Sequence, residues 1–386
     1  MEPAADVELL KPVGPLQMTR LSAAFAPFVI SVPQACLDTP SMMSLSERQF
    51  LFGLASRYYA GQGLIVDAGI FLGGSTHCFG EGVRSNPRRE EIVGHWPRPI
   101  VSYERAIVNP NMPHFFRTRG LAFSAAPGES FESELRRNIE PVEDLVDLRI
   151  GDFMEAGGVD APVEILFLDI LKTPALSLRA FRQFYSRLIP ERSLVVHQDY
   201  FFEELPWIKT HQEALMDYFD FVGEIGSSAL FLCRREIPQA VLDGLENDMP
   251  PAEQLRLASI ALHRSADPAR RFFMALSKMR LVRKLQGRVA ARAYLELVKT
   301  EFPEQVAQIG NKRLNHALQR ADAFLVKKPK KAPRDGMRVP EQRVPPPQQE
   351  GVHEQASHRR RSLALSPRRV PFSGPRPVPR GGKCLS

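Results

Sequence analysis

The stretch that decides the fold is VDAGIFLGGST, residues 66–76. It continues an apolar run that begins at Leu64, and it leads through glycines into a segment with helical character. Glycine lets the backbone turn tightly and approach a ligand closely. A buried strand that turns in this way into a helix is typical of a doubly wound α/β sheet, which binds ligands at the carboxyl ends of its strands. Asp67 is expected at that end, and the helix start after Gly74 would offer unpaired N–H groups to an anion.

Further apolar runs alternate with helical patterns along the next part of the chain. They lie at 100–103, 145–150, 163–168 and 194–196. Runs that are apolar on both faces and alternate with helices predict a parallel sheet covered on each side. Two more runs, 219–225 and 228–233, flank Gly226 and Ser227 and predict an antiparallel hairpin at the sheet edge. The expected fold is a doubly wound, mostly parallel, seven-stranded sheet.

Composition divides the chain into four parts. Residues 1–43 are rich in turn formers and predict an irregular lead-in. The α/β domain is expected over 44–250, and its first helix should begin at a capping box formed by Ser44 and Glu47. Residues 251–326 show helical spacing throughout, which predicts a segment of three or four short helices.

The last part, residues 327–386, differs from the rest in composition and charge. It contains 11 prolines and few large apolar residues, which predicts a disordered tail. It carries 15 basic and 4 acidic residues, a net charge of +11, so the net charge of +7 for the whole chain leaves −4 for the remainder. The folded body is therefore not expected to bind nucleic acid, whereas the tail suits an acidic partner.

The cysteines and the hydropathy pattern predict a cytoplasmic protein. The four cysteines form no C-x-x-C pair, so neither a disulfide framework nor a zinc site is expected. No apolar run approaches the roughly 18–20 residues of a membrane span, which argues against membrane insertion. A homodimer is an assembly that this composition allows.

Three ligand classes compete for the glycine turn. A dinucleotide site requires G-x-G-x-x-G, but position 71 is Phe; a nucleotide triphosphate loop requires G-x-x-x-x-G-K-[ST], but Ser75 stands in place of the lysine. The pattern Asp-x-Gly-x-x-x-Gly at Asp67, Gly69 and Gly73 resembles the first motif of class I S-adenosylmethionine-dependent methyltransferases, in particular the sugar and macrolide O-methyltransferase-like subgroup. The resemblance implies a Rossmann-like methyltransferase fold in which Asp67 and the Gly69 backbone bind the amino-acid end of the cofactor and Gly73 is a further cofactor-binding residue.

The resemblance covers residues 44–235 and implies further cofactor contacts at the ends of later strands. Glu104 follows the second strand, where the family has an acid that accepts hydrogen bonds from the ribose hydroxyls. Asp152 would contact the adenine amino group, and Phe153 would pack on the adenine ring. The alternatives are an ordinary strand-end glutamate and a Gly-Asp turn with no ligand.

Candidate catalytic residues follow the fourth and fifth strands. Asp169 ends a uniformly apolar run, and the resemblance implies that this position faces the reactive methyl group. His197 has an unperturbed pKa near 6.5 and is the natural base for a hydroxyl. Asp199 would orient the imidazole or join Asp169 as a ligand of Mg²⁺. The alternatives are a hydrogen-bonded core histidine and an aspartate that caps a helix.

Together these residues imply an S-adenosylmethionine-dependent methyltransferase, with Mg²⁺ as a second candidate cofactor. The chain has no Asp/Asn-Pro-Pro-Tyr run and no Pro-Cys nucleophile, which leaves the hydroxyl of a small molecule or glycan as the expected acceptor. The helix at 206–219 and the insertion at 85–99 are expected to line the acceptor pocket. The alternative function is a catalytically inactive scaffold that acts through the helical segment and the basic tail.

Overall fold

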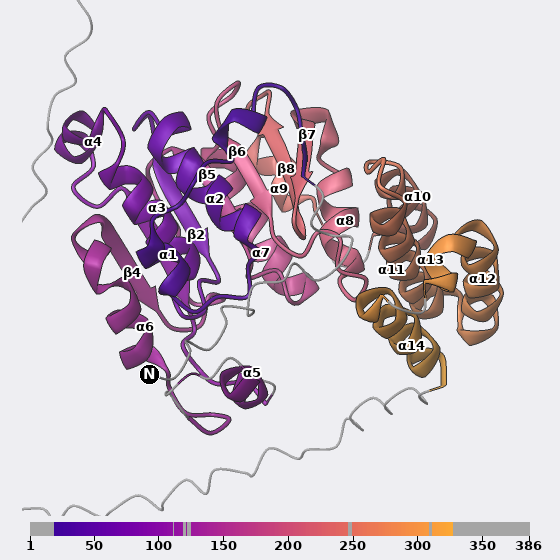
Figure 1. Ribbon diagram of the computed structural model, residues 1–386. Coiled ribbons are helices and arrows are strands. Elements are labelled where there is room, and N and C mark those ends of the chain that lie inside the picture. Colours follow the sequence, from indigo (N-terminus) through magenta and orange to yellow (C-terminus); the bar gives the residue numbers. More distant parts are fainter. Residues whose placement is uncertain are drawn as a thin grey trace, which may run out of the picture. The chain divides into compact units, whose positions relative to one another are not determined.

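The computed structural model of the chain is shown in Figure 1. It describes residues 19–110, 112–118, 121, 125–245, 249–308 and 311–326. All of these residues belong to one compact unit. The tail expected at 327–386 and the first 18 residues of the lead-in lie outside the described part. None of the described helices is both long and apolar enough to cross a bilayer.

One mixed eight-stranded sheet forms the centre of the described fold. Its spatial order is β1-β7-β8-β6-β5-β2-β3-β4. The strands are β1 (Arg20–Leu21), β2 (Leu64–Ala68), β3 (Ile100–Glu104), β4 (Val146–Ile150), β5 (Val163–Leu168), β6 (Leu194–His197), β7 (Phe219–Ile225) and β8 (Ser228–Cys233).

The five strands β2 to β6 are parallel, and β8, β7 and β1 extend the sheet by antiparallel pairs. The expected α/β class and mostly parallel sheet are confirmed. The expected number of strands is wrong, because the predicted irregular lead-in supplies β1, whose Arg20 and Leu21 pair with Glu224 and Gly223 of β7.

The order of the parallel strands fixes where a ligand site should be sought. From β2 the sheet runs through β3 to β4 on one side and through β5 to β6 on the other. This is the 3-2-1-4-5 order of doubly wound sheets, and it reverses between β2 and β5. The two strand ends meet there, since the N–H of Asp169 donates to the carbonyl of Ala68 at 2.8 Å. Sheets of this kind bind ligands at such a switch point.

Helices cover both faces of the sheet, as Figure 1 shows. The helices are α1 (Gln34–Asp38), α2 (Leu45–Gly53), α3 (Gly74–Arg84), α4 (Arg89–His95), α5 (Met112–Thr118), α6 (Glu132–Ile139), α7 (Pro174–Phe184), α8 (Pro206–Glu213), α9 (Gln239–Asp243), α10 (Pro251–Leu262), α11 (Pro268–Gln286), α12 (Arg288–Glu301), α13 (Pro303–Ala307) and α14 (Lys312–Val326). The predicted capping box is confirmed: Ser44 Oγ accepts from Glu47 N at 3.3 Å, and Glu47 Oε2 accepts from Ser44 N at 2.9 Å.

Two hydrophobic cores explain why the parallel strands are apolar on both faces. In β2, Val66 and Ala68 belong to the core shared with α7, α8 and the later helices, whereas Ile65 belongs to the core shared with α2, α3 and α6. Successive side chains of a strand point to opposite faces, so each strand must supply apolar residues to both cores.

The helical segment α10–α14 packs against the sheet domain and shares its first core. Within the described residues it consists of five helices rather than the expected three or four. Arg270 of α11 is fully buried, and its Nη1 lies 2.8 Å from Oε1 of Glu224 in β7. Its Nη2 donates to the carbonyl of Gly226 at 3.0 Å. This buried ion pair fixes the segment to the β7–β8 hairpin.

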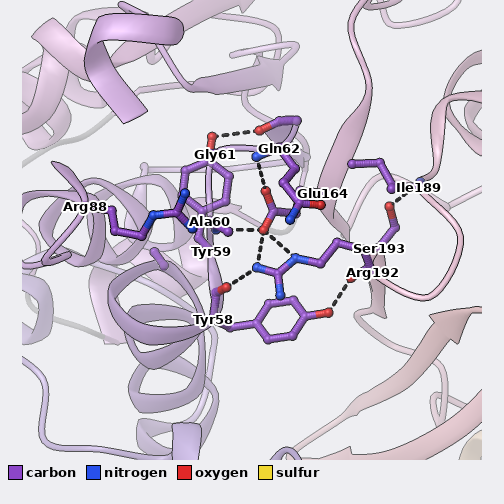
Figure 2. Close-up of polar contacts among 12 residues, drawn as sticks. Tyr58, Tyr59, Ala60, Gly61, Gln62, Arg88, Glu164, Ile189, Arg192 and Ser193 are labelled. Atoms are coloured by element: carbon purple, nitrogen blue, oxygen red, sulfur yellow. Dashed lines mark hydrogen bonds and ion pairs between the residues drawn. The ribbon is translucent and has the colours of Figure 1, made fainter. Parts of the chain in front are cut away.

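A polar cluster lies at the amino-terminal end of the parallel strands, where β5 begins (Figure 2). Glu164 is fully buried and accepts hydrogen bonds of 2.7 Å from the N–H groups of Ala60 and Gln62. Arg192, just before β6, donates to Glu164 from Nε at 2.8 Å and stacks its guanidinium over Tyr58 at 4.1 Å. Protein groups therefore satisfy the charge of Glu164 at the edge that doubly wound sheets do not use for ligands.

Candidate ligand site at the carboxyl ends of the strands

The glycine turn after β2 is shaped by contacts within the protein. Gly69 has φ +91°, and a Cβ placed on it would lie 2.8 Å from the carbonyl carbon of Asp169. Gly73 has φ +92°, and a Cβ placed on it would lie 2.5 Å from Cγ2 of Ile139 in α6. The Cα of Gly73 therefore packs against α6, and the expected contact of Gly73 with the cofactor stays a prediction. Gly69 still lines the edge where β2 and β5 meet.

Glu104 holds the same turn from the neighbouring strand. Its Oε2 accepts from the N–H of Phe71 at 2.6 Å, and its Oε1 accepts from the N–H of Ala106 at 3.1 Å. Phe71 and Ala106 both have positive φ, 52° and 56°, which non-glycine residues adopt only at a cost. Burial raises the pKa of Glu104, and these N–H groups oppose the rise. Each carboxylate oxygen keeps a lone pair, so its contact with a ribose remains a prediction.

Asp67 lies beneath the turn and is fully buried. Its Oδ2 accepts from Oγ1 of Thr76 at 2.7 Å, and Thr76 Oγ1 is 2.9 Å from Oγ of Ser102. Oδ1 is buried without a hydrogen-bond partner among the described residues. Burial raises the pKa of Asp67 to about 7, which the bond from Thr76 only partly opposes. Asp67 does not line the cavity at this edge, and its role in binding the cofactor stays a prediction.

The two residues expected at the adenine have different surroundings. Phe153 is buried, and its ring centroid lies 5.5 Å from that of Tyr103 and 5.8 Å from that of Phe184. The prediction that Phe153 packs on adenine is therefore corrected, because its ring belongs to the core. Asp152 is exposed after β4 and its Oδ1 accepts from the N–H of Met154 at 2.9 Å, which is turn chemistry. Its contact with adenine remains a prediction.

His197 lies in the core and not at the strand edge. It is fully buried, and its Nε2 is 2.8 Å from Oη of Tyr185 and 3.0 Å from Oε1 of Gln212. Burial lowers the pKa of His197 to about 4, so the ring is neutral near pH 7. The prediction that His197 takes a proton from the substrate hydroxyl is corrected, because the ring has no exposed surface that a substrate could contact. The alternative, a hydrogen-bonded core histidine, is what the structure contains.

Asp169 and Asp199 do come together, and Lys172 bridges them. Lys172 Nζ lies 2.5 Å from Oδ1 of Asp169 and 2.6 Å from Oδ2 of Asp199. All three side chains are partly exposed, by 22% for Asp169, 29% for Asp199 and 49% for Lys172. Asp199 has φ +59°, a strained conformation of the kind that clusters at functional sites. We call these three residues the acid–lysine bridge.

Lys172 decides the electrostatics of the bridge. Burial raises the pKa of Asp169 to about 7; Asp199 adds to the rise and Lys172 opposes it. Burial would also raise the pKa of Asp199, but the charges of Lys172, Lys209 and Arg313 outweigh it and the pKa is lowered. Although burial alone would lower it, the pKa of Lys172 is raised by the two carboxylates. Asp199 and Lys172 are therefore charged near pH 7, whereas Asp169 is divided between its protonated and its ionised form.

The residues as they lie do not fit Mg²⁺ between Asp169 and Asp199, which stays a prediction that would require Lys172 to move away. An ammonium group already lies between the two carboxylates, and Mg²⁺ prefers oxygen ligands. No cluster of three or more His, Cys, Asp or Glu residues that would hold a metal occurs in the part of the chain that the structure describes. Lys172 was not among the predicted site residues, and because residues 169–172 are not helical its spacing from Asp169 gave no signal.

A small cavity lies at the switch point, beside the acid–lysine bridge. Its walls include Ser41, Met43, Gly69, Ser75, Asp169 and Gln198. Its volume is about 20 Å³, room for about one water molecule, whereas small-molecule pockets usually measure about 300–1,000 Å³. The loop at 41–43 was expected to be an irregular lead-in, yet it forms one wall.

S-adenosylmethionine fits this edge in donor chemistry but not in volume. Oδ1 of Asp67 and the Gly69 backbone suit its amino-acid end and the lone pairs of Glu104 suit its ribose hydroxyls, but of these three residues only Gly69 lines the cavity. The 20 Å³ cavity does not admit it with the ring of Phe71 and the loop at 41–43 in their present positions. The segment 85–99, which was expected to line the acceptor pocket, lies instead near the start of β2. Trp96 Nε1 donates there to the carbonyl of Gly61 at 2.9 Å.

No protein-family model matches the chain, and no curated protein matches it either. The features that bear on function are therefore the switch-point cavity and the acid–lysine bridge.

Proposed function

We propose that the chain is a class I S-adenosylmethionine-dependent methyltransferase that acts on a hydroxyl group of a small molecule or glycan. The observation that carries the proposal is the cavity at the switch point, where the turn of the Asp-x-Gly-x-x-x-Gly motif meets Asp169. The 3-2-1-4-5 order of the parallel strands, followed by an antiparallel hairpin, supports a Rossmann-like methyltransferase fold.

Four residues would hold the cofactor. The Gly69 backbone and Asp67 would bind its amino-acid end, Glu104 its ribose hydroxyls and Asp152 its adenine amino group. When bound, the cofactor supplies a methyl group on an activated sulfonium. Its entry requires the ring of Phe71 and the loop at 41–43 to move, because together they leave only about 20 Å³.

Asp169 would take the proton of the acceptor hydroxyl. A pKa of about 7 suits a group that must accept a proton near neutral pH. Lys172 would act as a positioning residue, since it lies 2.5 Å from Oδ1 of Asp169 and limits the rotation of that carboxylate. Asp199 stays ionised and balances the charge of Lys172.

The second candidate function is a non-catalytic scaffold, and two observations favour it. The cavity is about 20 Å³, and the polar atoms of the acid–lysine bridge already satisfy one another. A scaffold of this kind would not need to bind the methyl donor. The two functions therefore differ in one measurable property, the affinity for S-adenosylmethionine.

Calorimetric titration of the full chain with S-adenosylmethionine tests the proposal. We expect saturable binding in the micromolar range and no binding of ATP. Phe71→Gly should tighten the binding, because it removes the ring and suits the positive φ of 52°. The matched control is Ala106→Gly, which relieves a similar φ of 56° without opening the cavity. If neither the folded parent chain nor folded Phe71→Gly gives a heat of binding with S-adenosylmethionine, the proposal is overturned and the scaffold function is favoured.

The role of Asp169 needs a separate measurement. Where the cofactor binds, release of S-adenosylhomocysteine can be followed with a panel of small-molecule and glycan hydroxyls. Asp169→Asn should keep the cofactor affinity and reduce the release at least 100-fold, since general-base catalysis contributes about 10²–10⁴-fold. Equal rates for Asp169→Asn and the parent chain would exclude Asp169 as the proton acceptor.

A further inference from the structure

The structure contains a much larger cavity, between α8 and the helical segment. Its volume is about 360 Å³, within the range of small-molecule sites. Its walls include Trp207, Thr210 and His211 from α8, Arg280 and Lys284 from α11, and Phe324 from α14. We propose that this cavity, the interhelical pocket, binds a small molecule with an apolar body and one carboxylate group. The pocket is independent of the proposed function, because it shares no wall residue with the switch-point cavity.

The apolar walls of the interhelical pocket are held in place. Phe324 has the guanidinium of Arg280 at 4.5 Å from its ring centroid and that of Arg283 at 4.1 Å. Trp207 donates from Nε1 to the carbonyl of Leu171 at 2.8 Å, which fixes the indole. A wall that is already ordered costs little entropy when a ligand binds, so the pocket is preorganised for an apolar body.

The charges around the pocket select an anion. Arg280 is balanced by Glu204, whose Oε1 lies 2.6 Å from Nη2 of Arg280. Lys284 is exposed, and among the residues that the structure describes no side chain forms an ion pair or hydrogen bond with it. His211 adds no charge near pH 7, because burial, followed by the charges of Lys284 and Arg182, lowers its pKa to about 4. The described wall residues therefore carry one positive charge, that of Lys284, without an acidic partner among them.

A single carboxylate matches this charge better than a phosphate does. A phosphate monoester brings up to two negative charges and three acceptor oxygens, and it is usually met by several donors. Within the described part of the wall, the pocket offers one unpaired ammonium, that of Lys284, beside mainly apolar side chains such as Trp207, Leu281 and Phe324. An aliphatic carboxylate of medium length satisfies both the charge and the apolar walls.

Fluorescence of Trp207 tests the proposal directly. The chain has two tryptophans, so Trp96→Phe leaves Trp207 as the only reporter. Decanoate is the probe, and decan-1-ol is its uncharged match. We expect a saturable change in the emission of Trp207 with decanoate, and at least tenfold weaker binding of decan-1-ol.

Charge reversal then identifies the recognition group. Lys284→Glu should weaken decanoate binding at least tenfold, and the milder Lys284→Gln should weaken it in the same direction. The matched control is Lys312→Glu, which makes the same change in charge on α14, 12 residues and about 18 Å before Phe324. No saturable change with decanoate would overturn the proposal, as would equal losses in the Lys284 and Lys312 variants or equal affinity for decan-1-ol.

Discussion

Glu104 receives a 2.6 Å hydrogen bond on Oε2 from the backbone N–H of Phe71. The bond joins the end of β3 to the turn that follows β2, and it holds Phe71 at a positive φ of 52°. The same carboxylate holds Ala106 at 56° through its other oxygen. One partly buried side chain thus supports two strained positions at the edge where the ligand is expected.

We expect Glu104→Ala to lower the free energy of unfolding by about 2–4 kcal/mol. It removes two hydrogen bonds to a partly buried carboxylate, each worth about 1.5–3 kcal/mol, and part of the loss is recovered when strain relaxes. Urea unfolding followed by circular dichroism measures the change. The exposed Glu90, in α4, provides the control Glu90→Ala, which should show no measurable loss. Equal stability of the two variants would contradict the role of Glu104.

Asp67 should make stability depend on pH. Its pKa of about 7 in the folded chain lies above the ordinary value of 3.8, so the folded chain holds a proton that the unfolded chain has lost. The free energy of unfolding should therefore fall as the pH rises from about 4 to about 7. Asp67→Asn has no such proton, and on going from pH 4 to pH 8 it should gain about 2–4 kcal/mol relative to the parent chain.

Urea unfolding of both chains at pH 4 and pH 8 measures the effect of Asp67. The fully exposed Asp160 offers the control Asp160→Asn, for which the difference from the parent should not change with pH. If Asp67→Asn behaves like this control, Asp67 is charged in the folded chain and its expected pKa is wrong.

The acid–lysine bridge can be tested through the pKa of Asp169. Lys172→Met removes the cation that opposes burial and the charge of Asp199, so the pKa of the Asp169 carboxyl should rise further above about 7. Carbon-13 NMR titration of the aspartate carboxyl groups gives the value. Because Lys172 is 49% exposed, we expect a stability loss of only about 1 kcal/mol or less. A fall in the pKa, or a rise in the control Lys312→Met as well, would contradict the bridge.

Arg270 should be essential for holding the helical segment. Arg270→Met leaves Glu224 buried without its cation, and breaking such a pair costs about 3–5 kcal/mol. The double variant Arg270→Met, Glu224→Leu removes both charges and should recover most of the loss. Urea unfolding measures both. Arg256→Met, in an exposed pair on α10, should leave stability unchanged, and an Arg270→Met chain as stable as this control would contradict the prediction.

Local patterns predicted much of the fold. The glycine turn, the apolar strands and the Ser44–Glu47 capping box are set by neighbouring residues, so their positions could be read from the sequence. The edge strand β1 could not be predicted, because it has only two residues. They form a strand only by pairing with β7 of the hairpin, some 200 positions further along the chain.

The site residues were harder to predict, because the sequence around the end of a strand does not show whether a side chain points into the core or toward the ligand edge. His197 is on the same face of β6 as Val195, and helices α7 and α8 cover that face, so it became a core residue. Asp169 and Asp199 lie beyond the last residues of β5 and β6, where the chain turns and exposes them. Their approach to Lys172 depends on the packing of two loops, which no local pattern encodes.

The hydrogen bond between Trp207 and Leu171 links the surroundings of the two cavities through the main chain. Leu171 directly precedes Lys172 of the acid–lysine bridge, and Pro174, three residues further on, lines the interhelical pocket. The indole in the wall of that pocket is thus anchored to the same short segment that carries the cation of the bridge.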